Sequence, residues 1–67
     1  MIRVQINGDR RSFESRLNIA ELVSQLALTG KKIAIECNGE LIPRSQYPFC
    51  EVLDGDKLEI VVAVGGG

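Results

Sequence analysis

Residues 2–26 read IRVQINGDRRSFESRLNIAELVSQL, and this stretch changes from the periodicity of strands to that of a helix. Apolar and polar residues alternate over Ile2–Ile6, which is the pattern of a strand with one buried face. Asn7-Gly8 follows, and because both residue types adopt positive φ at little cost, a tight hairpin turn is predicted. Residues 10–15, with Phe13 facing inward, are the expected return strand.

The second half of this stretch predicts an amphipathic helix. Asn18 can accept hydrogen bonds from the exposed amides of a first helical turn, and Glu21 stands where a capping box needs it. We therefore expect a helix of about three turns that begins after Asn18, with Gly30 suited to a left-handed cap. Its apolar face comprises Ile19, Leu22, Val23 and Leu26.

A second hairpin is predicted after the helix. Alternation returns over residues 33–37, Asn38-Gly39 supplies a turn, and residues 40–42 form a short return strand that Pro43 ends. Residues 45–49 follow neither periodicity, so an irregular or 3₁₀ crossover is expected there.

The last strand is expected over residues 57–62, after a turn at Asp54-Gly55-Asp56. Its alternation places Leu58, Ile60 and Val62 inward.

The order of these elements predicts an α+β fold in which one helix covers one face of a mixed sheet of about five strands. The ubiquitin-like β-grasp has this order, with its first and last strands parallel in the middle of the sheet. We expect a β-grasp domain over residues 1–64 and a flexible glycine tail over residues 65–67.

Composition excludes several classes of partner. Eight Lys and Arg against nine Asp and Glu give a net charge of -1, so nucleic acid is not expected. The longest apolar run, residues 60–64, is far shorter than a membrane span, and the N-terminus lacks a signal-peptide core. We expect a cytoplasmic protein with no membrane partner, no cofactor and no metal site, since histidine and CxxC motifs are absent.

Two cysteines, Cys37 and Cys50, are interpreted as free thiols without a catalytic task, because no base or cation stands near either in the sequence. Cys37 is in register with Ile33 and Ile35, which indicates a small buried core residue.

The three terminal glycines carry the candidate chemistry. Without Cβ atoms they can enter a channel too narrow for other residues. The carboxylate of Gly67, with a reference pKa of about 3.3–3.7, is ionised and could attack the α-phosphorus of ATP. A sulfur nucleophile could then displace AMP and leave a thiocarboxylate on Gly67, with Gly66 beside it. The competing interpretation is an inert, frayed end.

Apolar residues on the open face of the sheet are the candidate docking surface. They are Ala34, Val61 and Ala63, continued by Val64 and Gly65 toward the tail. Two basic pairs, Arg10-Arg11 and Lys31-Lys32, could serve as docking charges, but the favoured interpretation is solvated turn and strand-end residues.

The whole chain resembles the ThiS family of sulfur carrier proteins. The resemblance rests on the short length, Asn38-Gly39 before Leu41-Ile42-Pro43-Arg44, the Asp54-Gly55-Asp56 turn and the Val64-Gly65-Gly66-Gly67 ending. Many members end in two glycines, matched here by Gly66 and Gly67, which leaves Gly65 as an extra spacer.

This resemblance implies a carrier that is not itself an enzyme. A ThiF-type, E1-like adenylyltransferase would adenylate Gly67, a cysteine desulfurase would supply sulfur, and a ThiG-type thiazole synthase would take it for the thiazole ring of thiamine. Three alternatives remain open from the sequence: the related MoaD-type carrier of molybdopterin synthesis, a ubiquitin-like modifier of protein lysines, and an interaction module with an inert tail.

Overall fold

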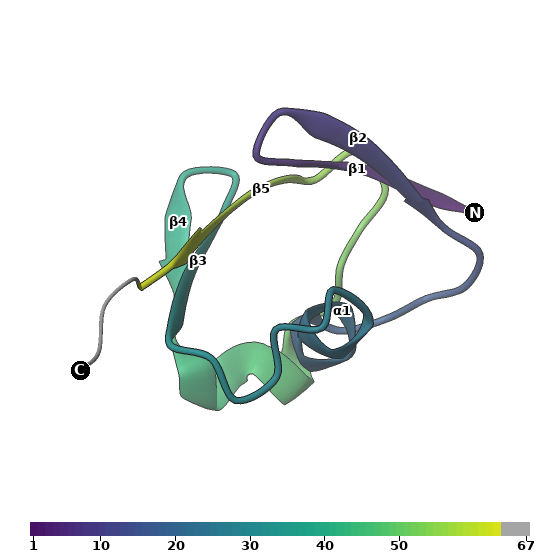
Figure 1. Ribbon diagram of the computed structural model, residues 1–67. Coiled ribbons are helices and arrows are strands. Elements are labelled where there is room, and N and C mark those ends of the chain that lie inside the picture. Colours follow the sequence, from purple (N-terminus) through teal and green to yellow (C-terminus); the bar gives the residue numbers. More distant parts are fainter. Residues whose placement is uncertain (64–67) are drawn as a thin grey trace.

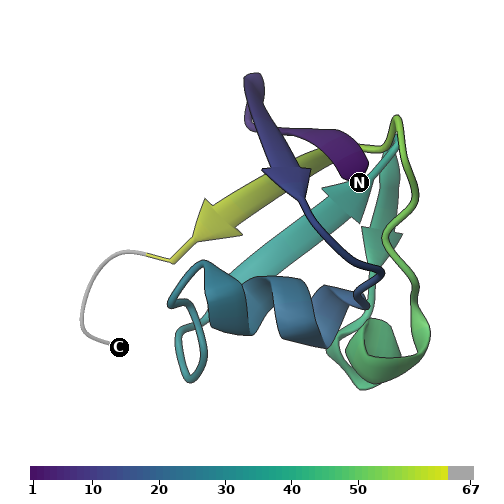
Figure 2. The same cartoon turned by 90° about the vertical axis from the view of Figure 1, so that its right-hand side faces the viewer.

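The computed structural model describes residues 1–63, which form one five-stranded sheet, one α-helix and one 3₁₀-helix. Figure 1 shows the strands as an arched layer with α1 on its concave side and the 3₁₀-helix η1 beside α1, and Figure 2 shows the same arrangement from the side, with α1 below the strands. The elements are β1 (Ile2–Ile6), β2 (Asp9–Phe13), α1 (Ile19–Gln25), β3 (Ile33–Cys37), β4 (Glu40–Ile42), η1 (Arg44–Phe49) and β5 (Lys57–Val62).

The strand order is β2-β1-β5-β3-β4, with β1 and β5 parallel and every other pair antiparallel. The mixed sheet with the first and last strands in its middle confirms the predicted β-grasp arrangement. The predicted domain boundary at residue 64 lies outside the described residues.

Both two-residue hairpin turns are confirmed. Asn7 and Gly8 have φ of 52° and 85°, and Asn38 and Gly39 have φ of 52° and 86°, as a type I′ turn requires. The first return strand, however, runs over Asp9–Phe13 rather than residues 10–15. The tight turn pairs Asp9 with Ile6, and Phe13 already pairs with Ile2 at the start of β1, so no partner remains for residues 14 and 15.

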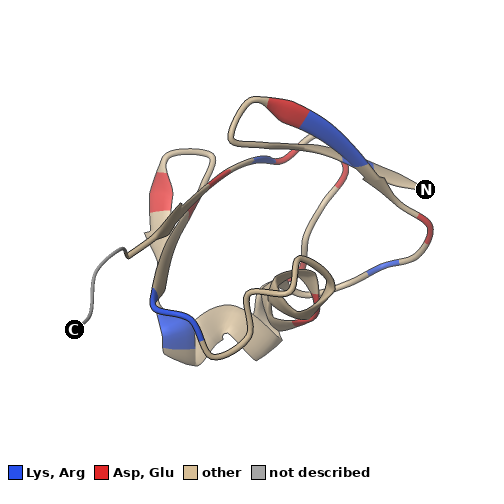
Figure 3. Cartoon of the chain, in the orientation of Figure 1, with Lys and Arg blue, Asp and Glu red and all other residues tan. Residues whose placement is uncertain are grey.

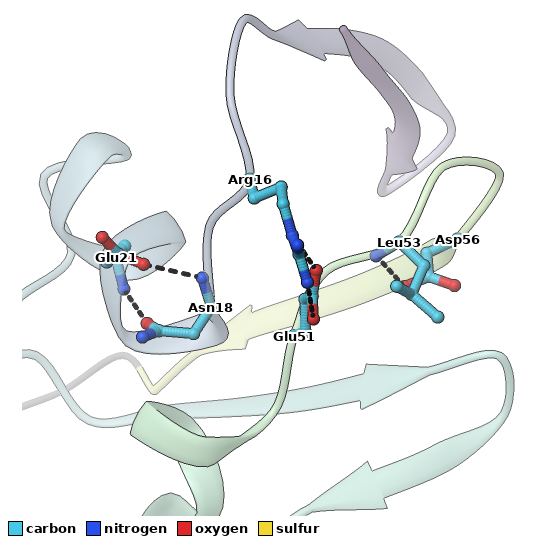
Figure 4. Close-up of polar contacts among 6 residues, drawn as sticks. All are labelled: Arg16, Asn18, Glu21, Glu51, Leu53 and Asp56. Carbon is cyan, nitrogen blue, oxygen red and sulfur yellow. Dashed lines mark hydrogen bonds and ion pairs between the residues drawn. The ribbon is translucent and has the colours of Figure 1, made fainter.

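The helix begins as predicted. Asn18 Oδ1 accepts from the Glu21 N–H at 2.8 Å, and Glu21 Oε1 accepts from the Asn18 N–H at 2.9 Å, which completes the capping box (Figure 4). Ile19, Leu22 and Val23 are buried.

The helix ends earlier than expected, at Gln25, so the prediction of Gly30 as its left-handed cap is wrong. Ala27 adopts the left-handed conformation instead, with φ of 60°. The Leu28 N–H donates to the Val23 carbonyl at 3.0 Å, and the Ala27 N–H donates to the Ser24 carbonyl at 3.0 Å, which is a Schellman motif. The motif turns Leu28 back against the core, and this contact offsets the unfavourable φ of Ala27.

Replacing Ala27 by glycine should stabilise the protein. A left-handed conformation costs an L-residue about 1–2 kcal/mol, whereas glycine costs about 0.5–1 kcal/mol in chain entropy. We expect Ala27→Gly to raise the free energy of unfolding by about 0.5–1 kcal/mol in urea denaturation followed by circular dichroism. The matched control is Ala20→Gly inside α1, which should lower it by about 1 kcal/mol. A loss of stability in Ala27→Gly would contradict this account.

The core lies between the sheet and α1, and residues outside both complete it. Leu17, Tyr47 and Val52 are buried although they belong to no strand and not to α1. Val62, expected to face inward, is 38% exposed because it ends β5, where it pairs with the first residue of β3. The other members of the core are Val4, Ile6, Ile19, Leu22, Val23, Ile35, Leu58 and Ile60.

The crossover is a 3₁₀-helix over Arg44–Phe49. For residues 45–49 the sequence predicted either an irregular segment or a 3₁₀-helix, and the second is confirmed. Backbone hydrogen bonds tie the chain after it to the chain before α1: Ile19 N–H to the Cys50 carbonyl at 2.8 Å, and Val52 N–H to the Leu17 carbonyl at 2.9 Å. On the surface of this junction, the Arg16 guanidinium donates to both carboxylate oxygens of Glu51 and lowers the pKa of that carboxyl (Figure 4).

Candidate functional site

Strand β5 leads directly to the predicted reacting group. Ala63 is the last described residue, and the predicted site residues Val64, Gly65, Gly66 and Gly67 lie outside the described part of the chain. The Ala63 N–H donates to the Lys32 carbonyl at 2.8 Å, so the chain is held against the start of β3 up to this point. The sheet thereby fixes where the last four residues begin.

The three described docking candidates lie together. Ala34 and Val61 are directly opposite each other in the antiparallel β3–β5 pair. Ala63 is two residues after Val61 and so lies on the same face of the sheet. All three are exposed, and Val61 is 64% exposed. They line a hollow of about 400 Å³, here called the β3–β5 hollow, whose full lining is Lys32, Ile33, Ala34, Arg44, Val61 and Ala63.

Two cations at this hollow were not predicted as part of it. Lys32 precedes β3 and Arg44 begins η1, and Figure 3 shows the basic residues of these two segments close together. The Arg44 guanidinium donates through Nη2 to the Lys31 carbonyl at 2.9 Å, which fixes its position. The sequence holds a weak signal for Lys32 in the Lys31-Lys32 pair, but none that joins Arg44 to it.

The open face of the sheet continues beyond the hollow. Leu41, 66% exposed, pairs with Glu36, and Glu36 pairs with Glu59, so all three side chains share this face with Val61. Leu41 is therefore a further exposed apolar group that sequence reasoning did not assign to the docking surface.

A separate basic hollow of about 320 Å³ lies at the other end of the open face. Its charged lining includes Arg3, Arg10, Arg11 and Lys57, contributed by β1, β2 and β5.

The Asp54-Gly55-Asp56 turn has a structural role. Asp56 is only 8% exposed, and its carboxylate accepts from the Leu53 N–H at 2.8 Å and from Asn38 Nδ2 at 3.1 Å. Asn38 Oδ1 in turn accepts from the Lys57 N–H at 3.0 Å, which joins the β3–β4 turn to the start of β5. Within residues 1–63, no group of three His, Cys, Asp or Glu side chains is arranged to hold a metal ion.

Both cysteines are free and half-buried. Burial, with the negative charge of Asp56 as a lesser cause, raises the pKa of the Cys37 thiol from its ordinary value of 9.0 to about 11. At neutral pH this thiol is protonated, so it is a weak nucleophile. Cys37 lies beside the core as predicted, but it is half-buried rather than fully buried.

The raised pKa of Cys37 predicts a loss of stability at alkaline pH. Between pH 9 and 11 the unfolded thiol loses its proton while the folded thiol keeps it, so rising pH favours unfolding. We expect wild type to lose more stability than Cys37→Ser between pH 8 and 11, measured by urea denaturation at each pH. Parallel curves for the two proteins would show that the thiol does not contribute.

None of the helices in residues 1–63 is long and apolar enough to cross a membrane.

Comparison with known proteins agrees with the fold and with the order of its elements. Residues 4–67 match the model of the ThiS family. The chain is 35% identical over 65 residues to the sulfur carrier protein ThiS of Bacillus subtilis, and the match covers 96% of this chain and 98% of that protein. It is also 41% identical over 66 residues to a thiazole synthase of Paramagnetospirillum magneticum, which covers 98% of this chain. The chain spans only 20% of the length of that synthase.

A solved structure shows the same architecture. The crystal structure of the thiamine biosynthesis protein ThiS from Geobacter metallireducens superimposes with a TM-score of 0.83 at 30% sequence identity, over 98% of this chain and 100% of that one. Because the family model spans nearly the whole sequence and the fold agrees with that of a solved member, this chain belongs to the ThiS family.

Proposed function

We propose that this protein is a sulfur carrier of thiamine biosynthesis and that the carboxylate of Gly67 carries the sulfur. The observation that carries the proposal is where the described chain leads. The central strand β5 ends at Val62, and Ala63, the last described residue, lines an exposed hollow and precedes Gly67 by four residues. Membership of the ThiS family and the similarity to a protein named sulfur carrier protein ThiS support the same function.

The chemistry proceeds in three steps that the carrier does not catalyse. A carboxylate oxygen of Gly67 attacks the α-phosphorus of ATP, pyrophosphate leaves, and a glycyl adenylate forms. The terminal sulfur of a desulfurase persulfide then attacks the acyl carbon and AMP leaves, which gives an acyl disulfide. A thiol attacks the S–S bond of this acyl disulfide, so that the terminus leaves as a thiocarboxylate and the thiol is oxidised to a disulfide. Gly66 has no side chain, so the end of the chain can enter a narrow active-site channel of the partner enzyme. The chain is thus a protein co-substrate, and we place it in the cytoplasm.

Three partner enzymes complete this proposal. A ThiF-type, E1-like adenylyltransferase activates Gly67, a cysteine desulfurase supplies the sulfur, and a ThiG-type thiazole synthase consumes it in forming the thiazole ring. The thiazole synthase of Paramagnetospirillum magneticum supports the last pairing, because it contains a stretch similar to this chain within a longer polypeptide.

The docking surface proposed for these partners is the apolar centre of the β3–β5 hollow. It comprises Ala34, Val61 and Ala63, continued by Val64 and Gly65 toward the reacting carboxylate. Exposed apolar groups on an open sheet face favour protein contact, because burying them removes apolar area from water.

A charge at the centre of this surface should weaken partner binding without unfolding the domain. Val61 is 64% exposed, so Val61→Glu costs little stability in the free protein but buries a charge in the complex. We expect the dissociation constant for the adenylyltransferase, measured by calorimetry, to rise at least tenfold. Leu53→Glu is the matched control, because Leu53 is 56% exposed and lies outside the hollow. Equal affinity of Val61→Glu and wild type would remove Val61 from the interface.

Intact mass spectrometry tests the proposed function itself. The protein is incubated with ATP, cysteine, the desulfurase and the adenylyltransferase, and the product is fragmented to locate any change. Replacement of one oxygen by sulfur adds about 16 Da, nearly the same as one oxidation, so the change must be assigned to Gly67. No gain with active partners, or a conjugate to a protein lysine, would overturn the carrier function.

A further inference from the structure

The lining of the β3–β5 hollow combines apolar and cationic side chains. Ala34, Val61 and Ala63 are its exposed apolar lining, and Lys32 and Arg44, here called the rim cations, line it as well. Among residues 1–63 the one ion pair joins Arg16 to Glu51, so neither rim cation has a carboxylate of this described part within 4 Å. The Arg44 guanidinium is held by the Lys31 carbonyl through Nη2, which leaves its other N–H groups available.

The opposite side of the same apolar centre carries negative charge. Glu36 and Glu59 are directly opposite each other in the β3–β5 pair, one step along the face from Ala34 and Val61. Both are exposed, and like charges in this position repel each other. Along the two strands the surface therefore passes from a negative pair, through the apolar centre, to the two rim cations.

We propose that the β3–β5 hollow receives an apolar side chain of a partner protein that is flanked by Asp or Glu, whose carboxylates pair with Lys32 and Arg44. This inference rests on the proposed function, and it specifies the chemistry of the partner surface. The carboxylates lie on the Lys32 side because the reverse placement would bring them against Glu36 and Glu59. The charges thus fix the direction in which the carrier lies on its partner.

This direction matters because Lys32 is adjacent to the end of the described chain. Its carbonyl accepts from the Ala63 N–H at 2.8 Å. A carboxylate bound at the Lys32 side chain therefore contacts the same residue whose backbone holds Ala63, the last described residue. The same contact that provides affinity would position the start of the tail over the partner's active site.

The test compares two double variants that remove the same charge. Lys32→Gln with Arg44→Gln removes the rim cations, and Arg10→Gln with Arg11→Gln removes two exposed cations of β2, far along the sheet. Binding to the ThiF-type adenylyltransferase and to the ThiG-type thiazole synthase is measured by calorimetry at low and high salt. We expect the rim variant to bind at least one partner ten times more weakly at low salt and to lose part of the salt dependence.

The β2 variant should keep affinity within about twofold, because its cations lie away from the contact. Arg44→Gln also removes the Arg44 hydrogen bond, and this loss could disturb the fold. In that case the same binding measurements are made on Lys32→Gln alone, which keeps Arg44, and on Arg44→Lys, which keeps the charge. Unchanged affinity of the rim variant for both partners, or equal weakening in both double variants, would overturn the inference. So would a wild-type dimer that the rim variant dissociates, since a second copy would then occupy the hollow.

Failure of this inference is distinguishable from failure of the proposed function. If wild type acquires sulfur on Gly67 and Val61→Glu weakens binding while the rim variant does not, only the charge assignment fails. If wild type acquires no sulfur from active partners, the carrier function fails first.

Discussion

Deletion of Gly67 should abolish sulfur loading completely. The proposed reaction needs a terminal glycine carboxylate at a fixed distance from the end of β5, and the deletion moves the carboxylate back by one residue, about 3.3–3.6 Å along an extended chain. A displacement of about 1 Å of a reacting group already costs on the order of 100-fold in rate. The measurement is the intact mass after incubation with ATP, cysteine, desulfurase and adenylyltransferase, with the added sulfur located by fragmentation.

Two controls make this result specific. Thermal unfolding of the deletion variant should match wild type, because the buried core described for the domain is formed by side chains between residues 4 and 60. Cys37→Ser and Cys50→Ser should load as wild type does, since neither thiol is assigned a part in the transfer. Sulfur found on the variant lacking Gly67, or lost from a folded cysteine variant, would contradict the proposed site.

Removing the Asp56 carboxylate should destabilise the domain more than any other polar substitution proposed above. Asp56→Ala leaves the Leu53 N–H without its acceptor (Figure 4), and it does the same to the Asn38 side-chain amide, in a position that is only 8% exposed. Hydrogen bonds to charged groups contribute about 1.5–3 kcal/mol each, and buried donors left unpaired cost about 1–3 kcal/mol. We expect the free energy of unfolding to fall by about 3 kcal/mol in urea denaturation.

The consequence of this loss is large for so small a protein. A chain of 67 residues has a stability on the order of 3–10 kcal/mol, so a loss of about 3 kcal/mol removes between a third and nearly all of it. Asp54→Ala is the matched control: the Asp54 carboxylate accepts from the Arg3 N–H at 2.8 Å, but this contact is exposed, and we expect a cost below about 1 kcal/mol. If Asp56→Ala and Asp54→Ala lower the free energy of unfolding equally, burial does not make the Asp56 hydrogen bonds more stabilising than the exposed Asp54 contact.

Local features of this protein could be predicted from the sequence. Each hairpin turn depends on two adjacent residues, Asn7-Gly8 or Asn38-Gly39, whose φ angles follow from their own chemistry. The capping box depends on Asn18 and Glu21, three residues apart, and the faces of β1 and β5 follow from alternation. Periodicity does not contain the strand order; the parallel pairing of the first and last strands was expected from the β-grasp fold that the order of the elements indicated.

Other features depend on residues that are distant in the sequence. The Asn7 side chain continues the short β1–β5 pairing by donating to the Ile60 carbonyl at 3.0 Å and accepting from the Ile60 N–H at 2.8 Å. From the sequence Asn7 was only a turn residue. The helix ends at Gln25 because Leu28 reaches the core, although Ala27 has no intrinsic preference for the left-handed conformation.

The candidate site also has some features that the sequence predicts and others that only the tertiary structure determines. Alternation along β5 and β3 predicts from the sequence that Val61 and Ala34 point outward, and the terminal glycines are visible without any structure. Whether Lys32 and Arg44 border the same hollow as Val61 was decided only by folding, which brings the start of β3, the start of η1 and the end of β5 together. The physical reason is range: backbone preference and side-chain period act over a few residues, whereas the packing of a sheet on a helix joins residues that share no local pattern.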